Sequence, residues 1–304
     1  METSARNIVL SLTSRLTASE NSPLSPKEFW SLYKHNDLTD FTNLNNNLIN
    51  SVSIDKSRIE SLLERGLSLA LKVENLENIG IWTITIADSE FPTILKQKLK
   101  DHCPPVIHGF GNKSILNNNN FGVVGSRKIT EEDQKISENV GNLCAKNGIT
   151  LVSGGAKGVD ISSMNGCINS GGTIICVLAD SLLKRAKDPT SQELALNDQA
   201  VFITNYSPEA EFSVGNAMGR NKIIYGLSNS VLVVTSDYQK GGTWSGATEA
   251  LKNNYSNVLV WEGTQITRGS KELIRLGAIP ISKYENVFSS KIENNKIEQM
   301  SLEI

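Results

Sequence analysis

Short apolar runs rich in β-branched residues alternate with stretches of helical periodicity over most of the chain. The runs that predict strands are, in chain order, residues 83–86, 121–125, 149–153, 173–178, 201–204, 231–235 and 257–261. Continuous apolar strands that alternate with helices are typical of a parallel sheet covered on both faces. We therefore expect an α/β fold, an extended Rossmann-like domain with a doubly wound, mostly parallel sheet over residues 78–282.

The clearest predicted helix begins after Thr130. The Thr130 hydroxyl and the Asp133 carboxylate have the spacing of a capping box, and Gly148 marks the helix end. One apolar stripe runs along this helix, formed by Ile136, Val140, Leu143 and Cys144.

The regions on either side of the predicted sheet have a different character. Residues 1–77 show helical periodicity in short pieces, with Ser25 and Pro26 in the positions of an N-cap and a first helical residue. An Asn-rich patch at 43–50 interrupts them. We expect a small helical N-terminal domain here, whose simplest role is packing or oligomerisation. Residues 283–304 are expected to form a polar tail, with no winged helix.

Composition limits the possible functions. The 304 residues carry a formal net charge of −2, which excludes a uniformly basic DNA coat, so any polyanion site must be local. The longest apolar run, Ile174 to Ala179, is too short to cross a bilayer, and the N-terminus lacks the apolar core of a secretory signal. We expect a cytoplasmic protein with no membrane contact. Its four cysteines contain no CxxC pair and its three histidines no HxxxH pair, so no disulfide, metal or cofactor is expected.

Ligands of open α/β sheets lie at the carboxyl ends of the strands, so the loops after the strands are the candidate sites. The first such loop is Gly125, Ser126 and Arg127, in which backbone and arginine suit a phosphate; the alternative is a tight turn with a solvated arginine. The acidic residues 131–133 would repel an anion from the next helix.

The second loop, residues 153–160, exposes amides of several glycines ahead of a helix. Its candidate phosphate-binding residues are Ser153, Gly154, Gly155, Lys157 and Gly158. Lys157 is equally well read as a solvated cation, and Asp160 as a helix cap.

The third region has two parts. Arg220, Asn221 and Lys222 are predicted at a helix start before the strand at 231–235, and Lys240, Gly241, Gly242 and Trp244 come after that strand in a loop. Arg220, Lys222 and Lys240 would form one basic patch, or else three separate surface cations. Trp244 suits stacking on a base, and equally well packing under its own loop.

Seven segments in this order resemble the DprA family of DNA-processing proteins. They are FPTILKQ (91–97), CPPVIHGFGN (103–112), FGVVGSRK (121–128), LVSGGAKGVD (151–160), GRNKIIYGLSNSVLVV (219–234), KGGTWSGATEAL (240–251) and GSKELIRLGA (269–278). The resemblance implies an extended Rossmann fold that binds single-stranded DNA in a positively charged pocket, as a homodimer, and delivers it to a RecA-like recombinase in transformation or recombination. By position, it implies binding roles for Gly125 to Arg127, for Ser153 to Asp160 and for Arg220 to Lys222.

One departure from that family keeps a second function open. Glu249 stands where the family has an apolar residue, and GGTxxGxxE looks like the signature of lysine-decarboxylase-like nucleotide phosphoribohydrolases. In that alternative, Arg220 holds a phosphate or a carboxylate and Glu249 assists attack by water on a ribose, or the two belong to a nucleotide sensor. The bland interpretation of Glu249 is an exposed helical acid. We favour the DNA-binding interpretation, which requires no catalytic residue.

Overall fold

The computed structural model describes residues 4–34 and 54–289. The Asn-rich stretch 43–50 and most of the expected polar tail lie outside the described residues. The chain divides into two compact units: residues 1–114 together with 178–216, and residues 115–177 together with 217–304. The domain boundaries expected near residues 77 and 282 stay predictions.

The first unit begins with the expected helical region. Its helices are α1 (Ala5–Thr13), α2 (Pro26–Tyr33), α4 (Lys56–Leu63) and α5 (Gly66–Glu77). Ser25 caps α2, as predicted, and forms a complete capping box with Glu28. Arg58 donates a 2.7 Å hydrogen bond to Glu28 Oε1, which lowers the pKa of Glu28 to about 2. These polar contacts fix how α2 and α4 meet over a core that includes Phe29 and Leu62, both fully buried.

Three antiparallel strands complete the first unit. They are β1 (Ile81–Thr85), β2 (Val106–Gly111) and β6 (Ala200–Thr204), with β2 in the middle. Short helices accompany them: α6 (Thr93–Leu99) and η2 (Lys100–His102) lie between β1 and β2 in the chain, and α9 (Leu182–Lys187) and α10 (Pro189–Leu196) precede β6. The sequence pattern predicted β1 and β6 and missed β2.

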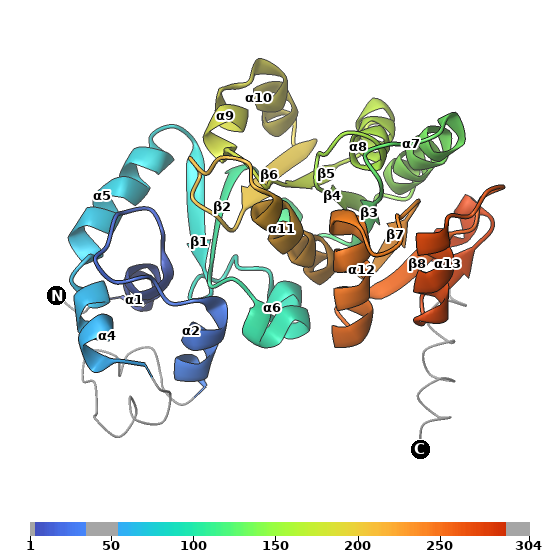
Figure 1. Cartoon of the computed structure of the whole chain (residues 1–304). Helices are drawn as coiled ribbons and strands as arrows, with labels where there is room; N and C mark the ends of the chain where they lie inside the picture. Colours follow the sequence, from blue (N-terminus) through green and yellow to red (C-terminus); the bar gives the residue numbers. More distant parts are fainter. Residues whose placement is uncertain (1–3, 35–53, 290–304) are drawn as a thin grey trace. The chain divides into compact units, whose positions relative to one another are not determined.

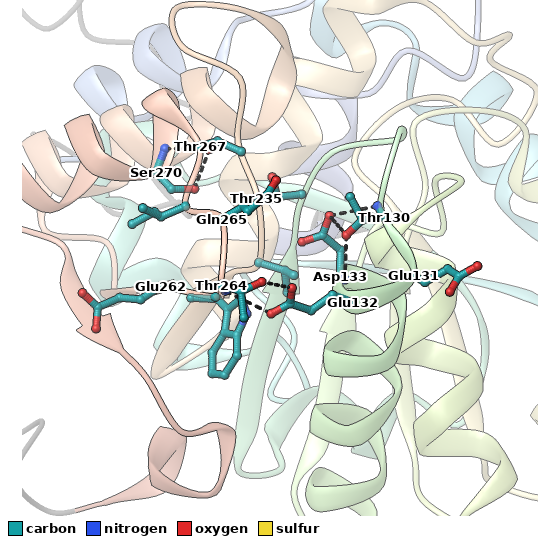
Figure 2. A pocket seen from close by; sticks show the side chains of 14 residues that line it. Thr130, Glu131, Glu132, Asp133, Thr235, Glu262, Thr264, Gln265, Thr267 and Ser270 are labelled. Atoms are coloured by element: carbon teal, nitrogen blue, oxygen red, sulfur yellow. Dashed lines mark hydrogen bonds between the residues drawn. The ribbon is translucent and has the colours of Figure 1, made fainter.

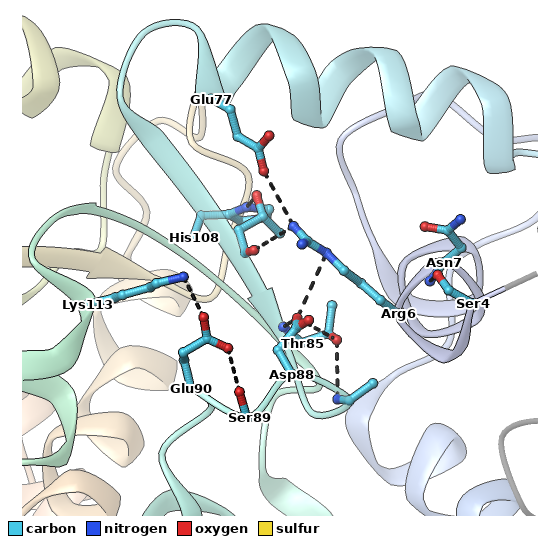
Figure 3. A network of polar contacts seen from close by, with 12 residues as sticks. Ser4, Arg6, Asn7, Glu77, Thr85, Asp88, Ser89, Glu90, His108 and Lys113 are labelled. Carbon is cyan, nitrogen blue, oxygen red and sulfur yellow. Dashed lines mark hydrogen bonds and ion pairs between the residues drawn. The ribbon is translucent and has the colours of Figure 1, made fainter.

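A polar network joins the N-terminal helix to β1 and its neighbours (Figure 3). Arg6 Nη2 donates a 2.9 Å hydrogen bond to the Thr83 carbonyl, and the guanidinium also pairs with Glu77 and Asp88 at 3.5 and 3.8 Å. His108 on β2 lies 2.9 Å from the Thr83 hydroxyl. Burial lowers the pKa of His108 to about 4, so this imidazole is neutral at physiological pH.

The second unit contains a wholly parallel six-stranded array. In spatial order its strands are β5 (Ile174–Val177), β4 (Thr150–Ser153), β3 (Asn120–Val124), β7 (Ser230–Val233), β8 (Asn257–Trp261) and β9 (Ile279–Ile281). Chain order reverses between β3 and β7, where Val124 pairs with Val233. This is the strand order of the doubly wound Rossmann sheet, and the reversal is the point where such sheets bind ligands.

Helices flank the parallel strands of this unit, and they confirm the predicted fold class. They are α7 (Glu131–Lys146), α8 (Val159–Asn169), α12 (Gly241–Asn253), α13 (Arg268–Arg275) and the part of α11 (Val214–Leu227) from residue 217 onward. Figure 1 shows α7 and α8 side by side, and the two pack closely. The predicted Thr130–Asp133 capping box is present. Short 3₁₀ turns occupy Lys113–Asn117 and Tyr284–Phe288.

No helix within the described residues is long and apolar enough to cross a bilayer.

Candidate nucleic-acid interface

Three loops leave the sheet at the reversal of strand order, after β3, β4 and β7. The loop after β3 contains Gly125, Ser126 and Arg127, of which Arg127 is exposed. The Ser126 amide donates a 3.1 Å hydrogen bond to the Thr235 carbonyl, and the Thr243 hydroxyl donates one of 2.8 Å to the Gly125 carbonyl. These bonds join the loop after β3 to the segment after β7.

The loop after β4 lies directly against the loop after β3. Gly158 has φ +86°, and a Cβ atom there would lie 2.4 Å from the Ser126 carbonyl oxygen. Only glycine fits this position, because any side chain would meet backbone. The Val159 amide donates a 3.3 Å hydrogen bond to the same carbonyl, so α8 begins where the two loops touch. Lys157, next to the contact, is exposed, whereas Ser153 is buried and donates to the Val123 carbonyl.

Arg220 is buried inside this unit. The prediction that it stands at a helix start is wrong, because α11 begins at Val214 and continues past it. Its Nη2 atom lies 3.5 Å from Asp160 Oδ2, and only 6% and 7% of the two side chains are exposed. Burial raises the pKa of Asp160, and the charge of Arg220 opposes that rise.

The Arg220 guanidinium fills the space in front of Gly154. A Cβ atom on Gly154 would lie 0.9 Å from Arg220 Nη1, so the glycine makes room for the guanidinium. The Ala156 amide donates a 3.4 Å hydrogen bond to Asp160, which ties the same loop to the ion pair. Arg220 and Asp160 therefore support the loop after β4 from within, and Arg220 does not present its charge to solvent.

The remaining residues of the third predicted region lie on or beside α12. Gly241, Gly242 and Trp244 belong to the first turn of this helix, so their assignment to a loop is wrong. Asn221 donates a 2.9 Å hydrogen bond to the Gly242 carbonyl and thereby ties α11 to α12. Lys240, the residue before the helix, is exposed.

Lys222 and Glu249 form an ion pair with a separation of 2.9 Å. The predicted patch of Arg220, Lys222 and Lys240 is therefore not a single exposed surface, because the first is buried and the second is paired. Glu249 therefore has a lysine as its partner, and Arg220, which the phosphoribohydrolase alternative assigned to a phosphate or a carboxylate, is paired with Asp160.

Trp244 packs in an aromatic cluster that the sequence did not indicate. Its ring meets Tyr238 edge to face, with centroids 5.1 Å apart, and the Arg268 guanidinium carbon lies 4.1 Å from the centroid of Tyr238. Tyr238 and Trp244 are half-buried and Arg268 is exposed.

A cavity of about 420 Å³ lies at the carboxyl ends of β7 and β8, beside the start of α7. Figure 2 shows its acidic lining residues Glu131, Glu132, Asp133 and Glu262. Glu132 accepts hydrogen bonds from the amide and the hydroxyl of Thr264, which lower its pKa and keep it charged. Because acidic side chains line this cavity, we still expect the region of residues 131–133 to repel phosphate.

Among the predicted site residues, Arg127, Lys157 and Lys240 are the ones that carry exposed positive charge at this edge of the sheet. They lie on three loops that hydrogen bonds and close backbone contacts join to one another. In residues 4–34 and 54–289, no three His, Cys, Asp or Glu side chains come together to hold a metal ion.

A doubly wound parallel sheet with glycine-rich loops at its strand reversal defines the class of Rossmann-like proteins. The model of the family described as DNA recombination-mediator protein A matches residues 82–291, and the chain belongs to that family.

Individual relatives agree with this assignment. The DNA processing protein DprA of Bacillus subtilis is 27% identical over 223 residues, 71% of this chain and 73% of that protein. Protein Smf of Synechocystis is 26% identical over 220 residues, which span 65% of this chain and about half, 54%, of the Smf protein.

Two solved structures share the fold. DprA of Streptococcus pneumoniae superposes with a TM-score of 0.76 at 20% identity, covering 95% of this chain and 99% of that one. DNA processing protein A of Helicobacter pylori, whose structure addresses its single-stranded DNA binding mode, has a TM-score of 0.55 at 23% identity and covers 71% of this chain and 96% of that one.

Proposed function

We propose that this protein binds single-stranded DNA without sequence preference. The observation that carries the proposal is the set of three exposed cations, Arg127, Lys157 and Lys240, on three interlocked loops at the strand reversal. Cations and backbone amides contact phosphates, which are the same in every sequence, so such a surface favours binding without base readout.

The chemistry of the surrounding residues supports a polyanion rather than a small substrate. Arg220 is buried against Asp160 and Glu249 is paired with Lys222, so the two residues of the nucleotide-hydrolysing alternative are each bound to a different partner. The single-stranded DNA binding described for the Helicobacter pylori protein also supports the proposal.

The role proposed for the bound DNA rests on membership of the family. We propose that the protein acts in the cytoplasm as a homodimer and delivers single-stranded DNA to a RecA-like recombinase, in recombination or natural transformation. Faster assembly of a RecA-type recombinase on an oligonucleotide bound by this protein would support delivery. Gel filtration with light scattering tests the homodimer.

A salt titration tests DNA binding itself. Affinity for a labelled oligo-dT should fall steeply between low and physiological salt, and Arg127→Ala should weaken binding about tenfold and make that dependence shallower. Lys146→Ala, which removes an exposed cation at the far end of α7, is the matched control and should bind like wild type. Absence of binding, or binding that does not respond to salt, would overturn the proposal.

A further inference from the structure

Tyr238, Trp244 and Arg268 form a compact cluster of two rings and one guanidinium, which we call the stacking cluster. Arg268 covers the ring of Tyr238 at 4.1 Å, and Trp244 meets the same ring at 5.1 Å with an interplanar angle of 74°. The three residues come from three places: the segment after β7, the first turn of α12 and the first residue of α13.

The backbone fixes this cluster. Gly269 comes directly after Arg268, and a Cβ atom there would lie 2.3 Å from the Ser236 carbonyl oxygen, so α13 begins in direct contact with the segment that carries Tyr238. The Thr267 hydroxyl donates a 2.7 Å hydrogen bond to the same carbonyl. Next to Trp244 on the first turn of α12, Thr243 is bonded to Gly125. The cluster is therefore held rigidly beside the loop that carries Arg127.

The cluster is not a buried core element. Arg268 is exposed and the two rings are half-buried. A guanidinium stacked on a ring has a second planar face, and nucleobases stack on both arginine planes and aromatic rings. The position next to the phosphate-binding loops is where the bases of a bound strand would lie.

We infer that the stacking cluster is a base-binding site, at which unpaired nucleobases of single-stranded DNA stack on Arg268 and the rings beneath it. This inference rests on the proposed DNA binding. It adds a second kind of contact, which is made to the bases of the strand rather than to its phosphates. Stacking accepts every base, so it agrees with binding that lacks sequence preference.

The test compares oligo-dT with an oligonucleotide of the same length that has the same phosphates and no bases. Wild type should prefer oligo-dT by about tenfold, the range expected for stacking of one or two bases. Arg268→Lys keeps the charge and removes the planar face, so it should reduce that preference at least about threefold and leave affinity for the abasic strand unchanged. Tyr238→Leu, which removes the ring beneath, should do the same.

Arg275→Lys is the matched control, because Arg275 lies on the same helix, is exposed and pairs with Glu272 of that helix. It should retain the full preference, and equal thermal midpoints should show that every variant is folded. Equal binding of both strands by wild type, or equal weakening of both by Arg268→Lys, would overturn the base-binding site and leave phosphate binding in place. If neither strand binds, the proposed function fails and the base-binding site with it.

Discussion

Arg220 and Asp160 form an ion pair 60 residues apart in sequence, with 3.5 Å between Arg220 Nη2 and Asp160 Oδ2 and almost no exposed surface. The Nε and Nη1 atoms of Arg220 are buried without hydrogen-bond partners among the described residues. Each member of a buried ion pair depends strongly on the other, because removal of one residue leaves the charge of the other uncompensated in the protein interior. We interpret Arg220 as a residue that positions the loop after β4, in contrast to Arg127, which is exposed.

Arg220→Ala and Arg127→Ala should therefore behave differently. Removing Arg220 leaves Asp160 buried and unpaired, and should lower the free energy of unfolding by about 3–5 kcal/mol. Removing exposed Arg127 should change it by no more than about 1 kcal/mol while weakening DNA binding. Urea unfolding of both variants, beside oligonucleotide binding, checks the prediction. Equal unfolding midpoints for Arg220→Ala and wild type would contradict the positioning role.

Gly158→Ala should disrupt the contact between the loops after β3 and β4. The added Cβ would meet the Ser126 carbonyl at 2.4 Å and the Arg127 Cα at 2.9 Å, so one loop must move. We expect a lower unfolding midpoint and weaker binding of oligo-dT. Gly171→Ala is the control, since Gly171 also has a positive φ (+75°) but nothing lies within 4 Å of its added Cβ. A similar effect of the two substitutions would show that backbone strain alone, and not the loop contact, is responsible.

The strands of the parallel sheet were predictable because they are buried on both faces and therefore continuously apolar. β2 was missed because His108, Gly109 and Gly111 interrupt its pattern, and His108 tolerates burial only as a neutral ring bonded to Thr83. β9 has three residues with Pro280 in the middle, which is too short and too irregular for a strand signal.

The sequence predicted which loops form the candidate site, but not which side chains pair with one another there. Glycines at strand ends identified the loops after β3 and β4, because a position where two backbone segments approach closely requires glycine, and glycine can be recognised in the sequence. The burial of Arg220 depends on Asp160, and the stacking of Arg268 depends on Tyr238. Both partners are distant in sequence, and charge alone does not tell a buried arginine from an exposed one.

Glu249→Gln should leave DNA binding unchanged or tighten it by at most about 1 kcal/mol. In the structure the Glu249 carboxylate neutralises Lys222 at 2.9 Å, and the neutral amide would release that positive charge for phosphates. Fluorescence anisotropy with oligo-dT at low and physiological salt measures the change. Glu272→Gln, which removes the partner of Arg275 on α13, is the control and should have no effect.

The same two proteins, wild type and Glu249→Gln, distinguish the enzymatic alternative. Incubation of wild type with nucleoside monophosphates should release no free base. Release by wild type that disappears in Glu249→Gln would contradict our interpretation and identify a phosphoribohydrolase, because general acid or base catalysis contributes at least about a hundredfold.

His108 should make the stability of the protein depend on pH. Its pKa is about 4 in the folded chain, against 6.5 for an unperturbed histidine, because the charged ring is not tolerated in its buried position. Between these two values the unfolded chain binds more protons than the folded one, so stability falls as pH is lowered from 6.5 toward 4. The full loss is on the order of 3 kcal/mol, with a slope of at most about 1.4 kcal/mol per pH unit.

Urea unfolding of wild type and His108→Gln at several pH values between 7 and 5 measures this contribution. Glu28 does not contribute to the slope in this range. Its pKa is lowered to about 2, so the stability that it provides is lost only as the pH falls below about 4.5. The raised pKa of Asp160 has the opposite effect, because it makes the folded protein more stable as the pH falls. Wild type and His108→Gln both contain the Asp160–Arg220 pair, so its contribution cancels when their slopes are compared. His108→Gln should have the shallower slope, whereas His102→Gln, at an exposed position, should keep the slope of wild type. Parallel slopes for wild type and His108→Gln would mean that the imidazole is not held neutral by burial in β2.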